Sequence, residues 1–115
     1  MQINELLNYV LHDLDDLKAI NISPLDVHLS TSITDYMVIA SGNSGRHVHA
    51  IADNLIRKMK ERLIAPFGIE GDANNEWVLV DLGDVVVHIM QPQTRDYYSL
   101  EKLWEQQYLP LTALA

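Results

Sequence analysis

The sequence predicts an α/β (α+β) fold, in which a small mixed β-sheet packs against helices in the chain order α-β-β-α-β-β-α. Three observations predict it. Apolar residues recur in steps of three and four in three segments, as on one face of an amphipathic helix. Short runs of alternating or continuous apolar residues lie between these segments and are typical of strands. Two such runs are separated by only two residues, which indicates a hairpin.

The first half of the chain begins with a helix. Its apolar stripe starts at Ile3, and we expect the helix to end by Ser23, because the residue before Pro24 is pushed out of helical geometry. Residues 25–30 alternate between apolar and polar and predict a short strand. Residues 34–41 are apolar on both faces in their middle, which predicts a strand in the centre of the sheet.

The second helix follows a turn-rich stretch, residues 41–45. Asn43 or Ser44 can cap its first turn, and Pro66 and Gly68 end it. Its buried stripe is predicted from apolar residues at helical spacing: Val48, Ile51, Ala52, Leu55, Ile56, Met59 and Leu63.

The hairpin joins residues 76–81 to residues 84–90 and has Leu82 and Gly83 as its turn. One face of the hairpin is then aliphatic and is expected under helices: Val78, Val80, Val85, Val87 and Ile89. The other face is mixed: Trp77, Leu79, Asp81, Asp84, Val86 and His88. A helix could partly cover this mixed face. If all three helices lie on the aliphatic side, the mixed face is open for recognition.

The last helix is predicted over residues 94–106, with Tyr97 in its buried stripe and Tyr98 pointing elsewhere. We expect one domain over residues 1–105 and an irregular tail over residues 106–115.

Composition narrows the function classes. The chain has 115 residues, of which 48% are hydrophobic and 21% charged, as in one globular domain. Sixteen acidic and eight basic residues give a net charge of −8, which disfavours binding to nucleic acid and favours binding to a basic partner. Cysteine is absent, so no disulfide or thiolate chemistry is expected. The sequence shows no signal-peptide pattern and no apolar run that would span a membrane, so we expect a soluble, cytoplasmic protein.

Two local patterns are candidate ligand sites. The first does not fit, because His47 and His49 are two residues apart on a helix, so their rings diverge and cannot share a metal. Residues 41–46 connect a strand to a helix and could hold an anion on free backbone N–H groups, although the spacing matches no known phosphate loop. A tight turn that needs glycine explains the same loop.

Carboxylates at strand ends could hold two metal ions: Asp26, Asp35, Asp81 and Asp84. A D-x-D pair is missing, however, and such residues commonly serve turns and caps. We therefore expect no enzyme, no metal and no cofactor.

Several segments together resemble one known family. They are residues 33–42 (ITDYMVIASG), 77–88 (WVLVDLGDVVVH) and 100–104 (LEKLW). In order and spacing they are similar to the ribosomal silencing factor family, also called Iojap-like, over roughly residues 20–104. The resemblance implies a nucleotidyltransferase-like fold that has lost its catalytic carboxylates. It also implies binding to the large ribosomal subunit through universal protein fourteen, which hinders association with the small subunit when nutrients are short.

The resemblance places partner contacts on Trp77, Leu82 and Tyr98. Leu82, at the tip of a turn, is expected to be exposed. From the mixed face we add a polar rim: Asp81, Asp84 and His88. The resemblance also implies that the partner is a basic protein and that direct rRNA contact is minor at most. Family members often form dimers, and a homodimer stays open for this chain. Two alternatives stay open, a large-subunit assembly factor and a residual nucleotide-binding or nucleotidyltransferase module.

Overall fold

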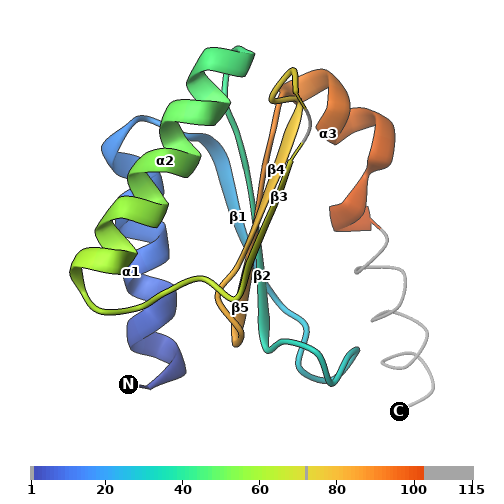
Figure 1. Cartoon of the computed structure of the whole chain (residues 1–115). Coiled ribbons are helices and arrows are strands. Elements are labelled where there is room, and N and C mark those ends of the chain that lie inside the picture. Colours follow the sequence, from blue (N-terminus) through green and yellow to red (C-terminus); the bar gives the residue numbers. More distant parts are fainter. Residues whose placement is uncertain (1, 72, 103–115) are drawn as a thin grey trace, which may run out of the picture.

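The computed structural model describes residues 2–71 and 73–102. It has a five-stranded mixed sheet with helices on both sides (Figure 1). The elements follow the order α1 (Ile3–Asp16), β1 (Ile20–Asp26), β2 (Tyr36–Ser41), α2 (Gly45–Glu61), β3 (Gly68–Gly71), β4 (Trp77–Asp81), β5 (Val85–Met90) and α3 (Pro92–Tyr98). The α/β fold class is confirmed. The predicted order lacked one strand, β3.

The strands lie in the order β1-β2-β5-β4-β3, with β2 and β5 parallel and every other pair antiparallel. β2 has neighbours on both sides, as its apolar middle predicted. β5 is buried along its whole length. The two ends of the sheet are β1 and β3.

One face of the sheet carries the main core. α1 and α2 cover it side by side, as Figure 1 shows. Their stripes bury Leu14, Leu55 and Met59 against Val80 and Val87, and all five side chains are fully buried. The expectation that the aliphatic face of the hairpin lies under helices is confirmed. Of the described helices, none is both long and apolar enough to cross a bilayer.

The opposite face of the sheet is covered by α3, at one end only (Figure 1). A smaller apolar cluster lies there, with Met90 and Ile39 fully buried and Trp77 and Leu100 packed on them. Of the two arrangements that the sequence left open, the structure therefore has the one in which a helix partly covers the mixed face. Sequence periodicity shows which residues share a face of a helix, but not which side of the sheet the helix packs on.

The first strand differs from its prediction in position. α1 ends at Asp16, because Lys18 adopts a left-handed backbone with φ of 59°. β1 then begins at Ile20 instead of residue 25, and its register against β2 shifts between Ile20 and Ser23. Pro24 lies inside β1, which is possible because β1 is an edge strand.

The start of α2 agrees with the prediction, whereas the bounds of α3 differ from it. Ser44 caps α2 as predicted, accepting a hydrogen bond from the His47 N–H at 3.2 Å. α3 begins at Pro92 and stops at Tyr98, because Ser99 adopts a left-handed backbone with φ of 50°. The predicted helix over residues 94–106 is therefore broken at Ser99. Its part from residue 103 on, together with the tail 106–115, lies outside the described residues.

Candidate functional site

Trp77 lies on the sheet face that α3 partly covers, next to α3 itself. It begins β4, and its side chain is half-buried. The indole Nε1–H donates a hydrogen bond to Nδ1 of His88 at 2.9 Å. The Tyr98 ring lies 4.8 Å from the indole, centroid to centroid, with the planes tilted by 53°. The indole is therefore held on one side by a hydrogen bond and on the other by an aromatic contact.

His88 is the buried support of Trp77. The sequence placed it on the polar rim, but it is 6% exposed, so the rim expectation is wrong for this residue. Burial lowers the pKa of His88 to about 4, which leaves the ring neutral at pH 7. Since Nδ1 accepts from Trp77, the proton is on Nε2, and this atom contacts no hydrogen-bond partner in the described part of the chain. The ring acts as a fixed acceptor beneath the surface.

Leu82 is buried instead of exposed, at 4%. The reason is the position of the turn. Its backbone N–H donates to the carbonyl oxygen of Val85 at 2.9 Å, so Gly83 and Asp84 are the two turn residues and Leu82 continues the strand pattern. Gly83 takes the positive φ of 86° that this turn requires. Leu82 therefore points into the core that α1 and α2 cover.

The hairpin register shifts by two residues relative to the prediction. Val78 pairs with Ile89, and Trp77 pairs with Met90 instead of His88. Because side chains alternate with a period of two, the predicted faces survive this shift. Trp77 lies diagonally across from His88, close enough for the hydrogen bond described above.

The two acids of the predicted rim differ in role. Asp81 is half-buried, and its Oδ1 accepts the N–H of Gly83 at 2.8 Å, which stabilises the turn. Asp84 is exposed in the turn itself, and its backbone carbonyl accepts the N–H groups of Asp35 and Tyr36. Both carboxylates lie at the end of the hairpin away from Trp77, so they do not form a rim around the aromatic site.

The two tyrosines of α3 are both exposed, Tyr98 at 52% and Tyr97 at 82%. The prediction of a buried Tyr97 is wrong, because the short α3 carries no buried residue and its stripe does not continue. The two rings meet edge to face at 5.0 Å. Trp77 and the two tyrosines thus form a continuous aromatic group, which we call the aromatic patch.

Beside the aromatic patch lies a pocket of about 420 Å³. Its lining comes from two neighbouring strands and α3: Glu70, Gly71, Trp77, Leu79 and Tyr98. Sequence reasoning missed Glu70 because it missed β3. In the structure Glu70 pairs with Leu79 across the strands, so both lie on the same face as Trp77.

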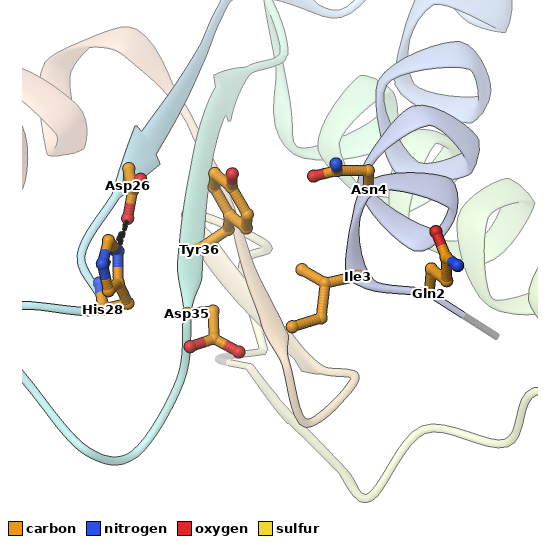
Figure 2. A pocket seen from close by; sticks show the side chains of 7 residues that line it. All are labelled: Gln2, Ile3, Asn4, Asp26, His28, Asp35 and Tyr36. Carbon is orange, nitrogen blue, oxygen red and sulfur yellow. Dashed lines mark hydrogen bonds and ion pairs between the residues drawn. The ribbon is translucent and has the colours of Figure 1, made fainter.

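A second pocket, of about 660 Å³, opens between the start of α1 and the β1–β2 edge (Figure 2). Its polar groups include Asp26, His28 and Asp35. Figure 2 shows the Asp26 carboxylate bound to the His28 ring, and this hydrogen bond lowers the pKa of Asp26. Of the four strand-end carboxylates, Asp26 and Asp35 line this pocket, while Asp26 is bound to a histidine and Asp81 accepts the N–H of a turn residue.

The imidazole of His47 stabilises the loop over residues 41–46 at the start of α2. His47 Nδ1 accepts the N–H of Asn43 at 2.9 Å, and its Nε2 donates to the carbonyl oxygen of Leu17 at 2.7 Å. The imidazole thereby joins the start of α2 to the end of α1, while His49 is exposed. The H-x-H pattern is explained by this structural role of His47.

One histidine and two acids on α1 also lie close together: His12, Asp13 and Asp16. Asp13 is fully buried and binds the guanidinium of Arg62 through both oxygens, at 2.6 and 2.9 Å. Asp16 binds Lys58, which lowers the pKa of the carboxyl. Two cations therefore already neutralise these two acids.

The family model for the ribosomal silencing factor during starvation matches residues 1–114. A ribosomal silencing factor of Haemophilus influenzae is 46% identical over 99 residues, which are 86% of this chain and 97% of that protein. A crystal structure of a Chromobacterium violaceum protein superposes with a TM-score of 0.89 at 44% identity, covering 91% of this chain and 88% of that one. A mouse protein named for mitochondrial assembly of the ribosomal large subunit is 46% identical over 74 residues, 62% of this chain and 32% of its own.

Proposed function

This chain belongs to the ribosomal silencing factor family, and from that premise we propose that it represses translation by binding the large ribosomal subunit. The contact is made through a basic ribosomal protein, universal protein fourteen. The bound factor then blocks association with the small subunit, chiefly under nutrient limitation. The observation that carries the proposal is the aromatic patch on the partly open face of the sheet.

The aromatic patch has the character of a protein-binding site. Tryptophan and tyrosine dominate the binding energy of interfaces, because they bury a large area at low conformational cost. Trp77 is already fixed by its bond to His88, so little of its freedom is lost on binding. Asp84 and the net charge of −8 favour a basic surface on the partner and repel RNA phosphates.

Leu82 and His88 support this face from behind. Leu82 anchors the turn that carries Asp84, and His88 orients the indole of Trp77. Substituting either residue would change binding by moving the exposed side chains, without a direct contact to the partner.

The mechanism is steric, so it needs no catalytic group and no cofactor. A folded domain that occupies the subunit interface excludes the other subunit by volume. The compartment that this mechanism implies is the cytoplasm, where ribosomal subunits meet.

The test is a subunit-joining assay, in which the purified chain is added to separated subunits and joined ribosomes are measured. Tyr98→Ala should weaken inhibition about 30-fold, which corresponds to a hot-spot contact of about 2 kcal/mol. Leu63→Ala is the control, because Leu63, which the sequence wrongly placed in the buried stripe of the second helix, is 94% exposed just after the end of α2, on the opposite side of the sheet. Full inhibition by Tyr98→Ala and by Trp77→Ala would refute the assigned face.

A second candidate is a role in large-subunit assembly, which the name of the mouse relative favours. An assembly factor would use the same docking face, so binding alone does not separate the two roles. The joining assay does, since an assembly factor that leaves mature subunits free to join would give undiminished ribosome formation.

A further inference from the structure

We infer that the pocket beside the aromatic patch receives one lysine or arginine side chain of the partner protein, with Glu70 as its counter-charge. The inference rests on the proposed function and deepens it, because it names the chemical group of the partner that this face binds.

The geometry of the pocket follows from strand register. Glu70 on β3 is paired with Leu79 on β4, and Trp77 lies two residues before Leu79 on the same face. Tyr98 reaches this face from α3, with its ring 4.8 Å from the indole. Side chains from three elements therefore line this open pocket of about 420 Å³.

The lining suits a long side chain that ends in a cation. Leu79 offers apolar surface for a methylene stem, and the aromatic rings of Trp77 and Tyr98 line the same pocket. Cations are attracted to the faces of such rings within about 6 Å of a ring centroid. A carboxylate at the rim adds a charge-assisted hydrogen bond and repels phosphate, which favours a protein cation over an RNA backbone.

Glu70 is available for this role. It is exposed, and among the described residues none forms a hydrogen bond or ion pair with its carboxylate. By contrast, several other acids are already engaged, including Asp13 with Arg62 and Asp16 with Lys58.

The indole wall of the pocket is formed before binding. The Nε1–H of Trp77 donates to Nδ1 of the buried His88 at 2.9 Å, which sets the plane of the indole. A cation that enters the pocket therefore meets an oriented ring, so binding loses less conformational entropy than with a free side chain.

The first experiment measures binding of the full chain to purified large subunits. Glu70→Gln, which keeps the shape and removes the charge, should weaken binding about tenfold and reduce its salt dependence. Glu70→Lys should weaken it further, and Glu70→Asp should retain part of the affinity. Asp53→Asn is the matched control, because it removes one exposed charge on α2 at the opposite side of the sheet. Equal affinities of Glu70→Gln and Asp53→Asn would overturn the inference.

The second experiment probes the pocket without the ribosome. Short amidated peptides with arginine, lysine or glutamate are titrated while the indole N–H resonance of Trp77 is followed by NMR, with Trp77→Phe identifying that signal. Arginine or lysine peptides should shift the resonance in the wild type, and the shift should be reduced severalfold in Glu70→Gln. Identical shifts by the glutamate peptide would overturn the inference.

The two experiments separate the two proposals. If the wild type binds large subunits and Glu70→Gln binds equally well, the pocket assignment fails and the proposed function stands. If the wild type does not bind subunits but the basic peptides shift Trp77 in a manner that needs Glu70, the proposed function fails and the cation pocket stands.

Discussion

Replacing His88 tests the buried support of the docking face through the pH dependence of stability. His88 is 6% exposed, and its pKa falls from 6.5 to about 4 because burial penalises the charged ring. The folded state therefore binds fewer protons than the unfolded state below about pH 6.5. Keeping the ring neutral therefore costs no folding free energy above the unfolded pKa of 6.5, and the free energy of unfolding decreases as the pH falls from 6.5 toward about 4.

The magnitude follows from the two pKa values. The gap between 6.5 and about 4 corresponds to about 3 kcal/mol once the pH lies below both values. Only part of this loss is reached at moderate acidity, and lowering the pH from about 7.5 to about 5.5 should cost about 1.3 kcal/mol. With a urea dependence of about 2 kcal/mol/M, this is a decrease of about 0.6 M in the unfolding midpoint.

The assay is urea unfolding of the wild type and of His88→Asn at both pH values. Asparagine keeps an acceptor near the position of Nδ1 for the indole N–H of Trp77, but it does not titrate. Other groups titrate alike in both proteins, so the difference between the two pH dependences isolates His88. If the wild type and His88→Asn lose the same stability on acidification, the reasoning about a buried neutral imidazole is refuted.

Three further predictions concern stability, each measured by urea unfolding. Arg62→Met should cost about 3 kcal/mol, because it leaves the fully buried Asp13 carboxylate without its cation; a cost below about 1 kcal/mol would contradict this. Leu82→Ala should cost about 2–4 kcal/mol as a core cavity, whereas Leu63→Ala should change stability by less than about 0.5 kcal/mol. Equal effects of these two variants would show that Leu82 is not core. Gly83→Ala should cost about 1–2 kcal/mol, since φ is 86° there; unchanged stability would argue against this turn.

The faces of the hairpin could be predicted because they depend only on alternation. A shift of two residues in register leaves every side chain on its predicted face, so Trp77 and His88 were correctly placed together. The burial of Leu82 depended on which two residues make the turn. Both possible turns, Leu82-Gly83 and Gly83-Asp84, contain the glycine that a tight turn needs. The hydrogen bond from Leu82 to Val85 decides between them, and it forms only in the folded strands.

β3 was missed for a related reason. It has only four residues, two of them glycine, and its pattern is visible only through pairing with β4. The place of Glu70 beside the aromatic patch therefore could not be derived from the chain alone. The side of the sheet that α3 takes is likewise a tertiary outcome, which local periodicity does not encode.

The two end strands of the sheet decide how another protein can approach. β1 contains Pro24, which has no N–H to donate, and its register is interrupted between Ile20 and Ser23. β3 is too short, and too rich in glycine, to serve as a good template for an added strand. Neither edge strand is therefore a good template for backbone pairing, whether with a neighbouring copy or with an unfolded chain. Another protein must therefore bind through side-chain contacts, and the edge strands protect a chain with two exposed tyrosines on one face from growing into sheet-like aggregates.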